Sequence, residues 1–201
     1  MTAQADGTGE TANETTGETT RRLTLLRHAK SDWPDHVPDH DRPLAKRGRK
    51  DAPRIGRWLR TRGYVPDVVI CSTAQRTRQT WDLMRPELDG SAEVRFEPRA
   101  YAASALTLLY LCRELPAPCR AALLIGHNPG IEELAASLGG AQEGAPEPAG
   151  LRFPTAAVAV FEFTGDWSTL APGQASLLAF TIPADLLRRA MRAGPRAARK
   201  T

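Results

Sequence analysis

Short apolar runs alternate with longer amphipathic segments along the chain from Arg22 onward. Apolar runs of about four to eight residues predict strands, and apolar residues spaced three and four apart predict helices. The predicted strands cover residues 22–27, 66–72, 92–98, 121–126, 155–163 and 175–183. The predicted helices cover residues 44–63, 73–88, 104–115, 131–140 and 184–193. In the first helix Ala52, Ile55 and Leu59 share one face, and Gly63 marks its end.

The order of these elements indicates the fold class. Strands that alternate with helices are typical of a parallel or mixed sheet covered by helices on both faces. The last two strands follow each other directly and are expected to form a pair. We therefore predict an α/β protein with three layers, α/β/α, around a mostly parallel central sheet. In such sheets ligands bind beyond the carboxyl ends of the strands.

The two ends of the chain differ from its middle. Residues 1–20 consist mainly of Thr, Gly, Glu and Ala without aliphatic periodicity, which is typical of a disordered segment. The 201 residues suffice for one domain of ordinary size. We therefore expect a disordered N-terminal tail over residues 1–20, a single domain over residues 21–190, and a basic C-terminal tail over residues 191–201. Within the domain, residues 139–150 have the composition of a loop.

The composition is that of a soluble globular protein, with 41% hydrophobic and 25% charged residues. No apolar run approaches the roughly 18–20 residues needed to span a bilayer, and residues 1–20 lack the bases and the apolar block of a signal peptide. The three cysteines, Cys71, Cys112 and Cys119, form no C-x-x-C pair, and an odd count is a poor disulfide framework. These features predict a cytoplasmic protein that does not associate with membranes.

The net charge of +4 comes from 27 Lys and Arg residues against 23 Asp and Glu residues. Four of the acids and none of the bases lie in residues 1–20, so the rest of the chain is more basic than the whole. A basic surplus suits an anionic partner, whether phosphate, an acidic protein or nucleic acid. The basic C-terminal run lacks the interleaved aromatic residues of a single-strand binder, so we do not expect nucleic acid to be the partner.

Three predicted strands end on residues that can do chemistry. The first ends at Arg27 and His28, the second at Ser72 with Arg76 one helical turn further on, and the fourth at His127. Each residue alone fits an ordinary loop or surface position. If the three strands are parallel neighbours, however, two histidines and two arginines converge on one crevice. The Pro- and Asp-rich loop over residues 31–44 starts three residues after His28 and is expected to form one wall of that crevice.

This set of side chains suits phosphoryl transfer. Guanidinium groups offer planar, permanently charged forks for phosphate oxygens. A neutral imidazole is a competent nucleophile, and a second imidazole can stabilise charge on the equatorial oxygens in the transition state. Because these groups supply the positive charge themselves, we expect neither a metal nor another cofactor.

The chain resembles the histidine phosphatase superfamily, which has the phosphoglycerate-mutase-like fold. The resemblance is carried by "LRHAKSDW", "DHDRPLAKRGRKDA", "PDVVICSTAQRTRQT" and "LLIGHNPG", which occur in the family's order and extend from about Leu23 to Leu138. The match is closest to the small SixA-like phosphohistidine phosphatases. Ala29 replaces the usual glycine of the family's first motif, a small-for-small change.

The resemblance implies a role for five residues. His28 corresponds to the histidine that becomes phosphorylated, and Arg27 lies beside it on the phosphate. Arg76 and His127 complete the pocket as catalytic and phosphate-binding groups. Ser31 stands where relatives place a hydroxyl near the phosphate. The expected ligand of this site is a phosphate or sulfate anion, or the phosphoryl group of a phosphorylated protein or small phosphoester.

The absence of a carboxylate from its usual place in the family indicates the class of substrate. Many relatives carry a catalytic acid after the third strand, where this chain reads "RAYAAS", and Glu97 just before it is a weak replacement. An alkoxide leaving group needs an acid, whereas imidazole, with a reference pKa near 6.5, leaves with little or no help. We therefore predict a phosphatase that removes phosphate from phosphohistidine on a partner protein in signalling.

The sequence leaves two other functions open and disfavours two more. A small-molecule phosphomonoesterase of the same superfamily and a non-catalytic module that binds phosphate or a phosphoprotein stay open. A cysteine phosphatase would need C-x₅-R, which Cys71 with Arg76 or Arg78 does not provide, so Cys71 is expected to be a buried apolar residue. His36 and His40 would align on a metal only in a helix, which the neighbouring prolines forbid.

Overall fold

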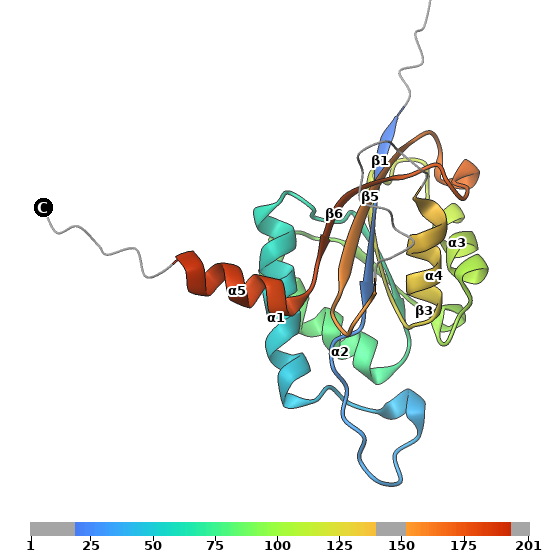
Figure 1. Ribbon diagram of the computed structural model, residues 1–201. Helices are drawn as coiled ribbons and strands as arrows, with labels where there is room; N and C mark the ends of the chain where they lie inside the picture. The colour runs from blue at the N-terminus through green and yellow to red at the C-terminus, as the bar shows by residue number, and fades with distance from the viewer. Residues whose placement is uncertain (1–18, 140–151, 194–201) are drawn as a thin grey trace, which may run out of the picture.

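The computed structural model describes residues 19–139 and 152–193, which form a sheet between two layers of helices (Figure 1). Its strands are β1 (Thr20–Arg27), β2 (Val68–Ser72), β3 (Glu93–Glu97), β4 (Ala121–Gly126), β5 (Val158–Thr164) and β6 (Ser176–Thr181). Its helices are α1 (Lys46–Thr61), α2 (Gln75–Met84), α3 (Ala105–Arg113), α4 (Gly130–Leu138) and α5 (Pro183–Ala193). The predicted α/β class, with three α/β/α layers, is confirmed.

The sheet has the strand order β3-β2-β4-β1-β5-β6. The first four strands in this order are parallel. Strand β5 pairs antiparallel with β1, and β6 pairs antiparallel with β5. Arg27 at the end of β1 stands opposite Gly126 of β4, and Cys71 of β2 stands opposite Ile125. The carboxyl ends of β1, β4 and β2 therefore lie side by side. This is the arrangement in which the candidate residues were expected to converge on one crevice.

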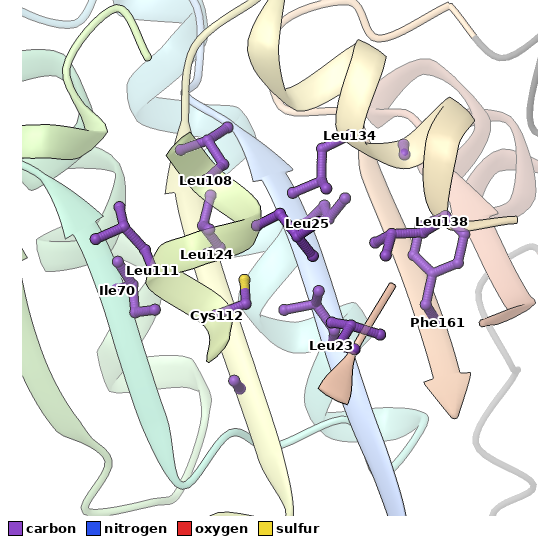
Figure 2. Packing of buried hydrophobic residues seen from close by; sticks show 14 of the residues in the cluster. Leu23, Leu25, Ile70, Leu108, Leu111, Cys112, Leu124, Leu134, Leu138 and Phe161 are labelled. Atoms are coloured by element: carbon purple, nitrogen blue, oxygen red, sulfur yellow. The ribbon is translucent and has the colours of Figure 1, made fainter. Parts of the chain in front are cut away.

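Side chains alternate across the sheet and build a core on each face. Leu23 and Leu25 of β1 belong to the cluster under α3 and α4, where Figure 2 shows them beside Leu124 and Leu134. Leu26 points to the other face and joins the cluster under α1 and α2. Since successive residues of a strand face opposite sides, an apolar strand buried on both faces is the expected result of this sequence.

Helix α5 follows β6 and lies beside α1 rather than over the middle of the sheet (Figure 1). Its Leu186 packs against the core cluster under α1 and α2, while Leu187 is exposed. The end of α1 agrees with the prediction, because Gly63 follows it with a φ of 71°, a conformation that glycine adopts without strain.

The expected domain boundaries meet the described residues only in part. Strand β1 begins at Thr20, and α5 continues to Ala193. Residues 1–18 of the predicted N-terminal tail, residues 140–151 with the predicted loop, and residues 194–201 of the predicted basic tail lie outside the described residues. Within residues 19–139 and 152–193, none of the helices is long and apolar enough to cross a membrane.

Candidate active site

His28 lies directly after β1, with its side chain 7% exposed. Its backbone N–H donates to the carbonyl oxygen of Gly126, which ties it to the end of β4. Its ring Nδ1 lies 2.8 Å from the carbonyl oxygen of Ala29. A carbonyl oxygen only accepts, so Nδ1 carries the proton and Nε2 keeps a free electron pair. Burial lowers the pKa of His28 to about 3, so the ring is neutral at physiological pH.

His127 follows β4, and its ring centroid is 5.2 Å from that of His28. Its Nδ1 lies 3.2 Å from Nη2 of Arg76, and its Nε2 lies 2.9 Å from Oγ of Ser72. Because a guanidinium only donates, Nδ1 accepts and Nε2–H donates to Ser72. Burial, with the charge of Arg76 second, lowers the pKa of His127 to about 4. The hydrogen bond to Ser72 therefore fixes the tautomer of His127, with the proton on Nε2 and Nδ1 as the acceptor beside Arg76.

Two arginines flank the imidazoles. Arg27, the last residue of β1, donates from Nη1 to the carbonyl oxygen of Phe153 at 2.7 Å. Arg76 lies in the first turn of α2 and is 6% exposed. It donates from Nη1 to the carbonyl oxygen of Asp39 at 2.5 Å and from Nη2 to the Asp39 carboxylate at 3.0 Å. Partial burial lowers the pKa of Arg27, but an arginine remains charged.

The loop between β1 and α1 folds back over this group and brings a carboxylate with it. Asp39 accepts hydrogen bonds from Tyr101 Oη at 2.7 Å, from Arg42 Nη1 at 2.8 Å and from Arg76. The Tyr101 bond, followed by the Arg42 bond, holds the pKa of the Asp39 carboxyl well below its usual range. Arg42 also donates to Oγ of Ser31 at 2.8 Å, which fixes that hydroxyl in place.

These residues line one cavity of about 390 Å³ at the carboxyl ends of the strands. All five predicted site residues, Arg27, His28, Ser31, Arg76 and His127, belong to its lining. The lining also contains Lys30, Trp33, Asp39, Arg42, Ala102, Asn128 and Thr155. The prediction that the loop over residues 31–44 forms a wall of the site is confirmed. The indole of Trp33 is exposed and has the guanidinium of Arg42 over its ring, 3.1 Å from the centroid.

Sequence reasoning did not single out Asp39, Arg42 or Tyr101. Asp39 and Arg42 stand in the quoted run "DHDRPL", which is the signal that could have identified them. Tyr101 stands in "RAYAAS", the segment after the third strand that lacks an acid. Its ring meets that of His127 edge-on at 5.5 Å, and its hydroxyl reaches Asp39. The acidic group of the site therefore comes from the loop before α1, not from the segment after β3.

The other candidate residues for catalysis or metal binding lie outside the cavity lining. Cys71 is fully buried in β2, and burial raises the pKa of its thiol to about 12, as expected for an apolar residue. Glu97 is paired with Arg99 at 2.8 Å and is not part of the cavity lining. His40 contacts Thr73 and Asp41. In the described part of the chain, no group of three or more His, Cys, Asp or Glu side chains could hold a metal ion.

The arrangement suits an oxyanion with a nucleophile beside it. Arg27 and Arg76 supply fixed positive charge, and the two histidines are neutral in the structure. The free Nε2 of His28 and the acceptor Nδ1 of His127 belong to rings in contact with each other. A tetrahedral anion bound between them would meet a nucleophile and several hydrogen-bond donors at once.

Comparison with known proteins agrees with this geometry. Residues 23–100 match the family model of the histidine phosphatase superfamily (branch 1). An uncharacterized protein of Mycobacterium tuberculosis (strain ATCC 25618 / H37Rv) is 38% identical over 161 residues, which cover 79% of this chain and 99% of the relative.

Solved structures show the same similarity. A protein from Nakamurella multipartitia, assigned as a phosphohistidine phosphatase SixA, is 34% identical with a TM-score of 0.72, over 82% of this chain and 96% of its own. The protein histidine phosphatase SixA complexed with tungstate is 22% identical with a TM-score of 0.64, over 82% of this chain and 99% of its own. The second comparison shows a common fold.

Proposed function

The chain belongs to the histidine phosphatase superfamily, and from this we propose that it is a metal-independent phosphatase that forms a phosphohistidine intermediate on His28. We further propose that its substrate is phosphohistidine on a partner protein. The observation that carries the phosphatase proposal is the state of His28, whose Nδ1–H is bound to Ala29 and whose Nε2 is free. The buried, unpaired thiols of Cys71, Cys112 and Cys119 fit a reducing compartment such as the cytoplasm.

In the first step, Nε2 of His28 attacks the phosphorus of the substrate. The Nε2–P bond forms while the bond from phosphorus to the leaving nitrogen breaks. The electron pair of that bond stays on the leaving ring, which departs as neutral imidazole because its other nitrogen carries a proton. Arg27, Arg76 and His127 hold the three equatorial oxygens, where negative charge is spread in the transition state. Because burial keeps His28 neutral, no proton has to leave the nucleophile before the attack.

His127 contributes most when it is protonated. In the structure its neighbours favour the neutral form, and its Nδ1 accepts from Arg76. A bound phosphoryl dianion places negative charge beside the ring and raises the pKa of His127. The proton taken up goes to Nδ1, since Nε2–H is already bound to Ser72. His127 then donates to a phosphoryl oxygen.

In the second step, water attacks the phosphorus of phospho-His28. The P–Nε2 bond breaks, its electron pair returns to His28, and the water protons are divided between inorganic phosphate and solvent. The same arginines and His127 stabilise the second transition state, because the phosphoryl oxygens stay in place while the attacking and leaving groups exchange sides.

The state of Asp39 supports a phosphohistidine substrate. Among the described residues that line the cavity, Asp39 is the one with a carboxyl group. Its hydrogen bonds to Tyr101, Arg42 and Arg76 keep this group ionised. It therefore has no proton to give to an alkoxide near neutral pH. A phosphohistidine substrate releases an imidazole, which is a much weaker base and needs little or no acid.

The tungstate complex of the SixA structure supports an oxyanion site in this fold. Tungstate is tetrahedral and doubly charged like phosphate. We place the corresponding anion between Arg27, His28, Arg76 and His127, with Ser31 at its edge. Ser31 is held through Arg42 and serves here as a phosphate-binding hydroxyl.

The first prediction compares three substrates: a phosphohistidine protein, a serine phosphopeptide and a sugar phosphate. We expect kcat/KM to be highest for the phosphohistidine protein. We expect His28→Ala to abolish turnover, because the second imidazole of the cavity lining, that of His127, has its Nδ1 bonded to Arg76 and its Nε2 bonded to Ser72. Trapping with labelled phosphoprotein at low pH should label wild-type protein but not His28→Ala.

The outcomes separate the alternatives. Faster turnover of the sugar phosphate or the phosphopeptide would identify a small-molecule or ester phosphatase and contradict the substrate proposal alone. Binding of phosphate without turnover of any of the three would identify a binding module. Wild-type rates in His28→Ala would contradict the mechanism.

A further inference from the structure

The first five residues of α1 are unusually basic for the start of a helix. Lys46, Arg47, Arg49 and Lys50 are all exposed there, with no acid in the first turn. Ala45 at the N-cap position provides no side-chain hydrogen bond. The N-terminus of a helix carries partial positive charge, so bases at this end destabilise the helix and acids would stabilise it. Apart from Arg47, which pairs with Asp51, these bases therefore do not serve the stability of α1.

Three of these bases, Lys46, Arg47 and Lys50, border a groove between α1 and α5. A cavity of about 520 Å³ lies there, on the side of the sheet where Figure 1 shows α5 beside α1. Its lining consists of Lys46, Arg47, Lys50, Asp51, Arg54, Ala184 and Leu187. We call it the α1–α5 groove. Leu187 is 39% exposed and gives the basic groove an apolar wall.

The lysines of the groove are unpaired, whereas its acid is neutralised internally. The buried carboxylate of Asp51 is paired with Arg47 at 3.3 Å and with Arg54 at 3.2 Å. Among the described residues, Lys46 and Lys50 form no ion pair. The groove therefore presents free ammonium groups beside an apolar side chain.

The groove adjoins the catalytic cavity through the start of α1. Ala45 donates its backbone N–H to the carbonyl oxygen of Lys30 at 2.9 Å, and Lys30 lines the cavity two residues after His28. Gly48 packs on the Lys30 backbone so closely that a Cβ would lie 2.2 Å from its oxygen. The first turn of α1 is thus fixed against the segment that carries the nucleophile.

We propose that the α1–α5 groove docks an acidic segment of the phosphoprotein substrate, with carboxylates on Lys46 and Lys50 and an apolar side chain against Leu187. The inference rests on the proposed phosphohistidine phosphatase function and assigns the surface that recognises the protein around the phosphohistidine. Charge complementarity selects an acidic occupant. The start of α1 contacts Lys30, which lines the catalytic cavity, so a protein bound in the groove lies next to that cavity. For this reason we identify the acidic occupant as the phosphoprotein substrate.

The test is the double variant Lys46→Glu/Lys50→Glu, measured on an acidic phosphohistidine protein and on free phosphohistidine. We expect kcat/KM for the protein to fall at least about tenfold, through KM, because opposite charges now repel. For free phosphohistidine we expect a change of less than about twofold. Glutamates at a helix N-terminus favour the helix, so thermal stability should stay equal or rise. Addition of salt should lower wild-type kcat/KM for the protein and reduce its advantage over the variant.

The matched control is Arg62→Glu/Arg120→Glu. Both arginines are exposed, and they lie after the end of α1 and before the start of β4, at the end of the sheet opposite the cavity. The control carries the same change in net charge. A loss in the control equal to that in the test variant would assign the effect to net charge and overturn the proposal.

Other outcomes are equally decisive. Unchanged kcat/KM for the protein in Lys46→Glu/Lys50→Glu would overturn docking while leaving the phosphatase proposal intact, and so would equal losses on both substrates. If wild-type protein hydrolyses no phosphohistidine, the proposed function fails and the docking inference with it. Deletion of residues 1–18, which contain acids and no bases, should change neither substrate's kcat/KM. A rise for the protein substrate would assign the groove to that segment instead and overturn the proposal.

Discussion

At the scale of single residues, the two imidazoles of the site are held in opposite tautomers by different partners. In His28, Nδ1–H donates to the backbone carbonyl of Ala29, whereas in His127, Nε2–H donates to Oγ of Ser72. The result is one ring with a free Nε2 and another whose Nδ1 accepts from Arg76. This division matches the two roles that phosphoryl transfer needs, a nucleophile and a donor that becomes charged when the anion binds.

The low pKa values of these histidines predict a stability that depends on pH. In the folded protein the values are about 3 for His28 and about 4 for His127, against about 6.5 in an unfolded chain. As the pH falls from about 7 to 4, the unfolded state takes up protons that the folded state does not, so the free energy of unfolding should decrease. Urea unfolding at several pH values without phosphate measures this decrease.

The control for this prediction is His28→Asn/His127→Asn, which cannot titrate at these positions. We expect its free energy of unfolding to vary less between pH 7 and 4 than that of the wild type. Equal pH dependence in the two proteins would show that the histidines are not held neutral by the fold.

Most of the predicted site residues stand at or near strand ends, and Ser31, in the loop after β1, was expected from the family resemblance. Arg27, His28 and His127 follow apolar strands, and Arg76 follows Ser72 by one turn, so periodicity and the rule for strand ends were sufficient. Asp39 reaches Arg76 across 37 residues through a loop without periodicity. The local sequence pattern does not predict how such a loop folds back over the site. For this reason the carboxylate of Asp39 was not predicted as part of the site.

At the scale of elements, two helices begin where glycine permits close packing. The Lys30 backbone leaves no room for a side chain at Gly48 of α1. The Ala103 backbone leaves none at Gly130 of α4, where an added Cβ would lie 2.1 Å from the Ala103 carbonyl oxygen. Gly130 comes three residues after His127, whose carbonyl oxygen accepts from Ile131 in the first turn of α4. The start of α4 therefore fixes the position of His127.

We predict that Gly130→Ala lowers both stability and activity. The added methyl group must displace the Ala103 backbone or the start of α4, at a cost of about 1–3 kcal/mol typical of overpacking. The displacement should also move His127 and reduce kcat. Urea unfolding and single-turnover kinetics measure the two effects.

Gly173→Ala provides a comparison. Gly173 has a φ of 75° and open space around it, so alanine there costs backbone strain without a clash. We expect its stability to fall while kcat is retained. If Gly130→Ala lost stability but kept the wild-type kcat, α4 would not position His127.

The type and order of the elements followed from the sequence more reliably than their ends. The helix predicted over residues 73–88 ends as α2 at Met84, because Pro86 lies in a following short 3-10 turn. The strand predicted from residue 155 starts at Val158 instead. Ala156 has a φ of 60°, and the N–H of Ala157 closes a turn onto Pro154. Apolar composition alone does not distinguish such a turn from the start of a strand.

At the scale of the whole molecule, the site depends on the sheet as one unit. The end of β1 supplies Arg27 to the cavity, and the segments after β1, β2 and β4 supply His28, Arg76 and His127, so an anion binds there only when the protein is folded. A ligand that binds the folded state alone stabilises it by about 2.7 kcal/mol at 100 times its dissociation constant. For a chain of this size, that corresponds to a rise in Tm of roughly 5–10 °C.

We therefore predict that inorganic phosphate at 100 times its dissociation constant raises the Tm of the wild type by that amount, as measured by differential scanning calorimetry. Arg76→Ala removes one of the two fixed charges and should reduce the rise at the same phosphate concentration to a small fraction. An equal rise in Arg76→Ala would place phosphate outside the proposed site.

The strand order also determines when the protein can mature during synthesis. Strand β1 pairs with β4 and β5, whose residues follow it by about a hundred positions or more. A ribosome that has made β1, α1, β2 and α2 has therefore made His28 and Arg76 but no partner for either edge of β1. Pairings of such long sequence separation form slowly and leave apolar strand edges exposed in the meantime. The nascent chain is thus a candidate client for chaperones until β5 emerges. A truncated product that ends before β4 would contain Arg27, Ser31 and Arg76 but not His127, without the complete sheet to hold them.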